Sequence, residues 1–121
     1  MGTWDIYPWD NDTAADWFGE LMDSTGFAER VGEALRRRPV DDHWEAIRAA
    51  GYILIHLGRV YIWPVNRLQD DLTVAVRQFE FIVQMLRRDD EPEFVQAVSN
   101  ELERLRARLN EYRWPDTASQ S

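Results

Sequence analysis

The stretch from Asp41 to Tyr61, DDHWEAIRAAGYILIHLGRVY, constrains the fold more than any other part of this chain. Its apolar residues cover two adjacent faces of a helix and leave only a narrow polar strip. One face carries Trp44, Ile47, Gly51, Leu54 and Gly58, and the other carries Ala46, Ala50, Ile53 and Leu57. Asp42 and Glu45 have the spacing of a capping box and mark the start. A helix of this kind must be covered by other elements on several sides.

The sequence predicts four further helices around this central one. Each shows apolar residues at helical spacing, with capping or breaking residues at its ends. They are expected near residues 13–23, 27–38, 71–88 and 92–112. The first should turn inward Ala14, Trp17, Phe18, Leu21 and Met22. Pro64 predicts a packed loop over residues 61–69, and Asp70 or Asp71 is expected to cap the helix that follows.

Residues 1–11 are predicted to form an irregular arm, because Pro8 and the aspartates around it oppose a helix. The arm should lie on the bundle through Trp4, Ile6, Tyr7 and Trp9. A length of 121 residues suits a single hydrophobic core. The predicted fold is therefore all-α: one domain over residues 1–115, a bundle of about five helices with the aromatic arm packed on it. Residues 116–121 are expected to be a disordered tail.

The last predicted helix has a heptad seam, whose apolar residues are spaced alternately by three and four. These are Val95, Val98, Leu102, Leu105, Leu109 and Tyr112. A two-chain coiled coil would use this spacing, but so would an antiparallel neighbour in the same chain. The preceding helix offers a matching stripe, so an intramolecular hairpin is expected. A second row on that helix, Val74, Phe81 and Met85, would then be free for contact, which predicts a monomer or a weak homodimer.

The charge and the cysteine content narrow the possible partners and compartments. A net charge of −8 argues against nucleic acid, whose binding needs clustered cations, and favours a basic protein as partner. The chain has no cysteine, which fits a reducing compartment. Its first residues are acidic where a secretion signal would be basic, and no apolar run reaches membrane-spanning length. The sequence therefore predicts a cytoplasmic protein without a membrane partner.

Few residues suggest catalysis. The chain has two histidines, His43 and His56, and neither occurs in a zinc or di-iron motif. His56 lies in the most apolar helix and is expected to be a satisfied core residue, whereas His43 near the helix start should be solvated. No glycine loop for phosphate and no serine in a nucleophile motif is found. We therefore expect no catalytic residue, no metal site and no cofactor.

One group of acidic residues is a candidate binding site. Asp12, Asp16 and Glu20 are four residues apart and form a row of like charge on the first helix, with Asp10 just before it. Such a row could bind a cation or an arginine-bearing partner. Alternatively, these acids are favoured by the positive end of the helix, and the arginines at 36–38 of the same chain are candidates to pair with them. The sequence favours this second interpretation.

The opening MGTWDIYPWDNDTAADW resembles the start of a family of small bacterial proteins of unknown function, which begin M-G-x-W-G-x-G-x-F-x-N-D-x-A-x-D-W. The matching residues are Met1, Gly2, Trp4, Asn11, Asp12, Ala14, Asp16 and Trp17. Asp5 and Tyr7 replace two family glycines. The stretch EAIRAAGYILIHLGR is similar to the family's alanine-rich central helix. This resemblance implies an all-α domain and supplies no activity.

Three functions are compatible with these features. The sequence favours a non-enzymatic interaction or structural domain. The alternative is an immunity-like or antitoxin-like protein, since a small acidic chain can mask a basic toxin. A further alternative is a metal-dependent enzyme with carboxylates at Asp10, Asp12, Asp16 and Glu20.

Overall fold

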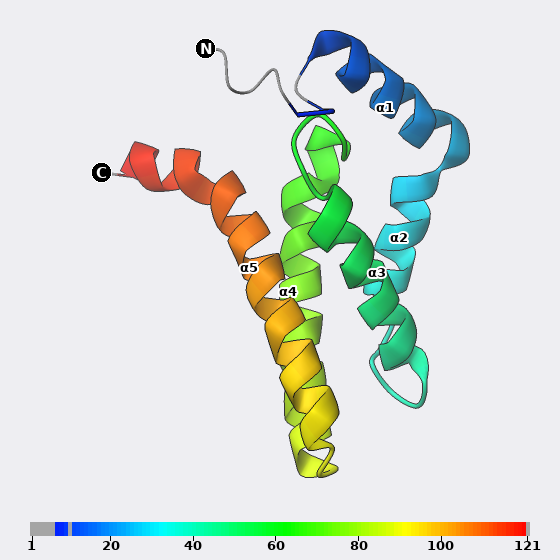
Figure 1. Cartoon of the computed structure of the whole chain (residues 1–121), viewed down its shortest axis with the longest axis vertical. Helices are drawn as coiled ribbons and strands as arrows, with labels where there is room; N and C mark the ends of the chain where they lie inside the picture. Colours follow the sequence, from blue (N-terminus) through cyan, green and yellow to red (C-terminus); the bar gives the residue numbers. More distant parts are fainter. Residues whose placement is uncertain (1–6, 10, 121) are drawn as a thin grey trace.

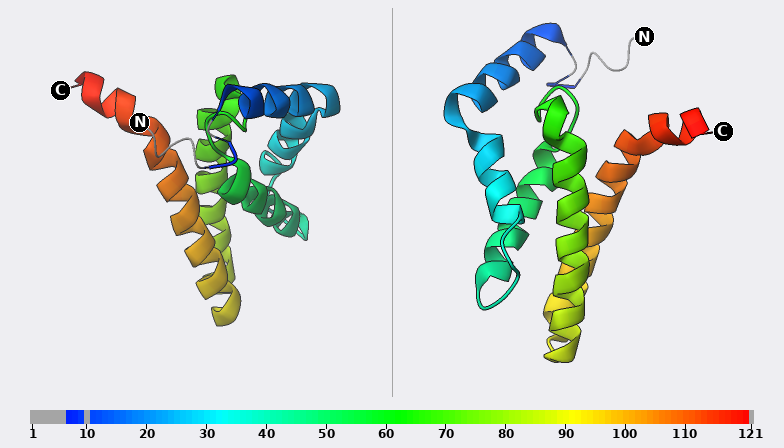
Figure 2. Two further views of the ribbon diagram at one scale, coloured as in Figure 1. Left: turned by 45° about the horizontal axis from the view of Figure 1, so that its top comes forward. Right: turned by 180° about the vertical axis from the view of Figure 1, so that it is seen from behind.

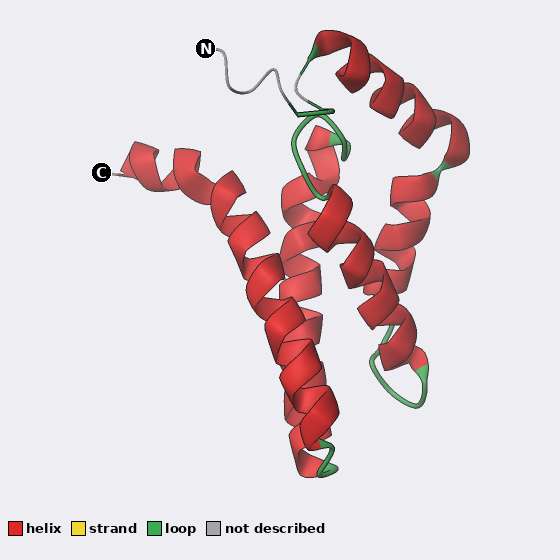
Figure 3. Ribbon diagram, in the orientation of Figure 1, coloured by secondary structure: helices red, strands yellow, loops and turns green. Residues whose placement is uncertain are grey.

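The structure is a computed structural model that describes residues 7–9 and 11–120, with side chains as far as residue 111. In these residues the chain forms a single domain of five helices without strands, which confirms the predicted all-α fold (Figures 1 and 3). The helices are α1 (Asp12–Thr25), α2 (Phe27–Leu35), α3 (His43–Leu57), α4 (Val65–Arg88) and α5 (Pro92–Gln120).

The two longest helices, α4 and α5, form an antiparallel hairpin along one side of the molecule (Figure 1). The turn between them contains Asp90 with a φ of 58°, and the N–H of Glu91 donates to the carbonyl of Leu86 at 3.1 Å. The α5 seam is buried at Val98, Leu102, Leu105 and Leu109. The predicted intramolecular hairpin is therefore confirmed.

Helix α3 packs against α2, α4 and α5 and holds the bundle together (Figure 1). Ile47 and Leu54 are fully buried, and Gly51 allows the ring of Phe79 on α4 to lie directly against the backbone. This confirms the predicted central helix. Its solvent-facing strip is wider than expected, however, because Tyr52 and His56 are both exposed. Asp42 precedes the helix without a side-chain capping bond, so the predicted capping box is wrong.

The connection between α3 and α4 is packed, as predicted. Ile62 and Trp63 are buried, and their N–H groups both donate to the carbonyl of Arg59, at 3.1 and 2.9 Å. This tight turn places Tyr61 at a φ of 80°, and its ring is half exposed. The connection thus places the indole of Trp63 in the core and the phenol of Tyr61 at the surface.

Helix α4 begins at Val65, so the predicted start at Asp70 or Asp71 is wrong. Pro64 occupies the capping position with a φ of −55°, a value that suits the beginning of a helix. Pro64 therefore ends the α3–α4 connection and allows α4 to start at the next residue. Asp71 consequently lies inside the helix and is fully buried.

Helices α1 and α2 form a bent pair, in which α1 lies across the top of the molecule in Figure 1 and α2 runs down its side next to α3 (Figures 1 and 2). Asn11 caps α1, since its Oδ1 accepts the N–H of Ala14 at 2.8 Å. Gly26 makes the bend with a φ of 64°, which is accessible to glycine without strain. Of the helices, α1 contacts only α2 in the described part of the chain, and Met22 is its one buried residue.

The predicted N-terminal arm falls partly outside the described residues, and Trp4 and Ile6 cannot be placed within it. Of the residues that are described, Trp9 is partly buried against the core. The ring of Tyr7 stacks on Trp9 with centroids 5.1 Å apart, and the guanidinium of Arg59 lies 4.2 Å from the centre of the Trp9 ring. This part of the arm contacts the α3–α4 connection.

Helix α5 continues to Gln120, whereas the sequence predicts an end near Tyr112. Pro115 lies inside the helix, and the ribbon changes direction towards its C-terminal end in Figure 1. A proline inside a helix removes one backbone hydrogen bond and bends the axis without necessarily ending the helix. None of the helices in the described residues is long and apolar enough to cross a membrane.

Candidate functional site

The predicted acidic row lies along α1, open to solvent. Asp12, Asp16 and Glu20 are all exposed, and Asp10 lies outside the described residues. In the described part of the chain none of the three forms an ion pair. Helix α1 also carries Asp23, so it has four carboxylates and no arginine.

The arginines at 36–38 do not pair with this row. Arg36 turns towards the core instead, and its Nη1 donates to Asp71 Oδ1 at 2.9 Å. Arg37 and Arg38 are exposed. Pairing between the acidic row and these arginines is therefore not found among the described residues, and Arg36 pairs instead with a buried carboxylate on α4.

Among the described residues, no group of three or more histidines, aspartates or glutamates could hold a metal ion. His43 is exposed, as expected. The prediction of a core position for His56 is wrong, since this residue lies on the exposed strip of α3. Its ring contacts the edge of Tyr52, with centroids 4.5 Å apart.

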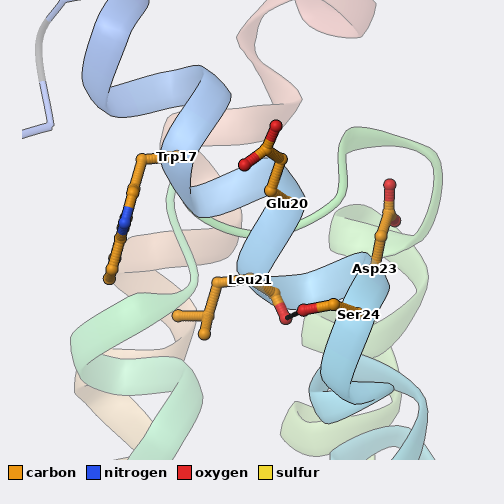
Figure 4. Close-up of a pocket in the computed structure, with 5 residues that line it drawn as sticks. All are labelled: Trp17, Glu20, Leu21, Asp23 and Ser24. Atoms are coloured by element: carbon orange, nitrogen blue, oxygen red, sulfur yellow. Dashed lines mark hydrogen bonds between the residues drawn. The ribbon is translucent and has the colours of Figure 1, made fainter.

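Beside the acidic row, α1 exposes an apolar surface. Trp17 is 59% exposed and Leu21 is 37% exposed. They line a hollow of about 570 Å³ together with Glu20, Asp23 and Ser24. In Figure 4 the side chains of Trp17 and Leu21 extend to one side of the helix, and the two carboxylates point the other way. We call these five residues the α1 groove.

The sequence predicted that Trp17 and Leu21 would face inward, and the structure places them on the surface. The reason is that α1 meets only α2, so its apolar face is wider than the contact available to cover it. Phe18 packs partly against the core and its ring meets Trp17 edge to face, at 5.3 Å. Periodicity shows which residues share a face, but not how much of that face is covered.

Asp71 is the centre of a buried polar network that the sequence did not reveal. Its carboxylate accepts hydrogen bonds from Arg36, from Arg67 Nε and from Trp63 Nε1, each at 2.9 Å. The network joins α2, the α3–α4 connection and α4. A buried carboxylate needs such partners, and these satisfy it. We assign it a structural role.

A second hollow, of about 400 Å³, lies between α3 and α5 and is lined by Trp44, Arg48 and Phe94 among others. Arg48 Nε and Nη2 donate to the carboxylate of Glu101 at 2.8 and 2.6 Å. This hydrogen bonding raises the pKa of Arg48 above its ordinary value, against the opposing effect of burial. The rings of Trp44 and Phe94 meet edge to face at 5.8 Å. The charges of Arg48 and Glu101 pair with each other, and this ion pair links α3 to α5.

The fold and the α1 groove define a small all-α domain with an acidic, partly apolar surface on its first helix. The chain belongs to the family described as "Domain of unknown function (DUF4259)", which matches residues 2–118. The match extends over almost the whole chain and agrees with the expected family of unknown function. Comparisons with curated proteins and with solved structures returned no match.

Proposed function

We propose that this protein is a non-enzymatic interaction domain that binds a basic helical segment of a partner protein along α1. The observation that carries the proposal is the exposure of Trp17 and Leu21 in the α1 groove. Tryptophan is among the residues that contribute most to binding energy when a partner covers them. An apolar surface edged by polar groups is typical of an interaction site.

The charge of α1 indicates the chemistry of the partner. Asp12, Asp16, Glu20 and Asp23 give this helix four negative charges without a cation. A surface of this kind attracts arginine and lysine and repels other acidic proteins. The partner should therefore present cations beside its apolar residues.

An amphipathic helix meets both requirements, since it carries apolar side chains on one face and cations along its edges. The hollow of about 570 Å³ in the α1 groove gives room for the apolar side chains of such a helix. An immunity-like or antitoxin-like role is a special case, in which the basic segment belongs to a toxin.

The metal-dependent enzyme has less support. The three described carboxylates of the row project from one exposed helix face, and calcium usually takes six to eight oxygen ligands. No described carboxylate from another element completes the set. Binding of a basic helix uses the row and the groove together, so we prefer it.

Calorimetric titration with a designed peptide tests the proposal. The probe is a helical peptide with leucine on one face and arginine on the other, compared with a version that carries glutamate in place of arginine. We expect only the arginine peptide to bind. Trp17→Ala should weaken binding by at least about 2 kcal/mol, or roughly thirtyfold, because it removes the central anchor.

Tyr52→Ala is the matched control, because Tyr52 on α3 is 58% exposed, almost as much as Trp17. This variant should bind the arginine peptide as the parent does. The proposal fails if the glutamate peptide binds equally well, or if Trp17→Ala leaves the affinity unchanged in a chain that stays helical by circular dichroism.

A further inference from the structure

The hollow between α3 and α5 is bordered by three aromatic rings. Trp44 and Tyr52 come from α3 and Phe94 comes from α5, and all three line the space of about 400 Å³. The planes of Trp44 and Phe94 meet at 85°, so the two rings border the hollow in different directions. Tyr52 and Phe94 are both exposed, so the hollow opens to solvent. Its volume lies within the range of small-molecule sites.

The hollow exists because α3 carries a small side chain between larger ones. Ala49 lines it, four residues after Glu45 and three before Tyr52, and residues at these spacings are neighbours on one face of a helix. Ala49 is exposed. A larger side chain at this position would therefore fill the hollow without disturbing the core.

The charged residues that line the hollow include one carboxylate that is not balanced. The guanidinium of Arg48 is held by Glu101 through two hydrogen bonds, at 2.8 and 2.6 Å, so these two charges balance each other. Glu45 is exposed and forms no ion pair among the described residues. Arg48 also lies 5.9 Å from the centre of the Phe94 ring, so a cation already rests against one aromatic wall of this hollow.

The segments around the hollow are acidic as well. Residues 41–45 lead into α3 and residues 89–93 lead into α5, and together they carry seven carboxylates and no arginine. The arginines that flank these segments, at 37–38 and 87–88, balance only part of this charge. The positive end of each helix amounts to only about half an elementary charge. The surroundings of the hollow therefore favour a cationic ligand.

We propose that this hollow binds the alkylated ammonium group of a small organic cation. Aromatic faces attract such a cation, and its alkyl groups make apolar contact with the rings. Trp44 and Tyr52 are eight residues apart, or about 12 Å along the helix axis, so a cation over Ala49 lies between them. Glu45 supplies the opposite charge. The site lies on α3 and α5 and is independent of the α1 groove.

Calorimetric titration of the full chain with choline tests the site at constant ionic strength in sodium chloride. The comparison is the neutral analogue of choline, in which a tert-butyl group replaces trimethylammonium. We expect saturable binding of choline and roughly tenfold weaker binding of the analogue, because the analogue keeps the shape but loses the attraction to the rings. The proposal is overturned if choline does not bind, or if both compounds bind equally well.

Filling the hollow provides a second test. Ala49→Leu should weaken choline binding roughly tenfold or more, and the variant should stay helical by circular dichroism, because leucine suits an exposed helix position. Tyr52→Ala should also weaken choline binding, while it leaves the binding of the arginine peptide to α1 unchanged. These two measurements separate this site from the α1 groove. Unchanged choline affinity in a folded Ala49→Leu chain would show that the cation binds elsewhere.

Phe94→Leu keeps an apolar side chain but removes an aromatic wall, and it should weaken choline binding roughly threefold or more. Phe81→Leu is the matched control, because Phe81 on α4 is 42% exposed, against 43% for Phe94, and lies outside the hollow. Glu45→Gln should also weaken binding, whereas Asp70→Asn, at an exposed position of α4, should not. Equal losses in a variant and its control would mean that the hollow is not the site, and would contradict the proposal.

Discussion

Asp71 is the one polar residue that is buried in the described part of the chain, and its carboxylate is fully buried. Asp71→Asn keeps the size of the side chain but removes the charge that faces Arg36 and Arg67. We expect the free energy of unfolding to fall by about 3 kcal/mol, the lower end for a broken buried pair, because both arginines are partly in water. Urea denaturation measures the change.

The neighbouring residue gives a matched control for this prediction. Asp70 is exposed and forms no ion pair within the described residues, so Asp70→Asn should shift the urea midpoint very little. Equal midpoints for Asp71→Asn and Asp70→Asn would mean that the network contributes nothing to stability.

The sequence could not identify the role of Asp71, and the reason is physical. An aspartate before an apolar helical stretch has the usual character of a cap, and only the earlier start of α4 places it inside the helix. Arg67 lies one turn away and could have been noticed. Arg36 is 35 residues distant, and no local pattern predicts a contact across that separation. The exposed Trp17 was missed for a similar reason, since exposure depends on what other helices cover.

At the scale of the helices, the contact between α3 and α4 depends on a missing side chain. A Cβ atom at Gly51 would lie well inside contact distance of Phe79 Cζ. Gly51→Ala should therefore push the helices apart and lower the free energy of unfolding by about 1 to 3 kcal/mol, as overpacked cores do. Thermal or urea denaturation would detect this loss.

A glycine-to-alanine substitution in α1 should have the opposite effect on the free energy of unfolding. Gly19 lies inside the helix, and a Cβ atom there would meet nothing within 4 Å. Gly19→Ala should raise stability by up to about 1 kcal/mol, because alanine loses less backbone entropy in a helix. If both alanine variants change stability in the same direction, the close approach of α3 and α4 is not what makes Gly51 necessary.

Helices as a whole were more predictable than their ends. The apolar spacing indicated all five, and the seam from Val98 to Leu109 indicated the hairpin, because these patterns arise from burial along a long contact. The position where a helix begins or ends depends on single residues, and a proline is compatible with a loop, with the start of a helix or with a bend inside one. Pro64 directly precedes α4 although the sequence places it within a loop, and Pro115 lies within α5 although the sequence predicts an end near Tyr112.

At the scale of the whole molecule, the α5 seam is buried within one chain and is therefore not available to join two copies. Phe81 is 42% exposed, whereas Val74 and Met85 pack partly against the core, so the row available for a second copy is narrow. We expect light scattering over a dilution series to report a monomer, or a weak dimer that dissociates on dilution. Any such dimer should be lost in Phe81→Glu.

Leu105→Glu serves as the comparison, because Leu105 is fully buried between α4 and α5. It should unfold the chain instead of separating two folded copies, since it places a charge in the core. A tight dimer that survives Phe81→Glu, and that Leu105→Glu splits into folded monomers, would show that the seam joins two chains.

The sparse attachment of α1 also affects how readily this protein can evolve. With Met22 as its one buried residue, α1 contributes little to the core. Apart from the backbone effect at Gly19, substitutions at its exposed positions should change stability by less than about 0.5 kcal/mol. A kind of substitution that would unfold the chain when made in α3 or α4 is therefore tolerated when made on the surface of α1. Natural selection can therefore alter the exposed surface of this helix residue by residue, while the remaining helices preserve the fold.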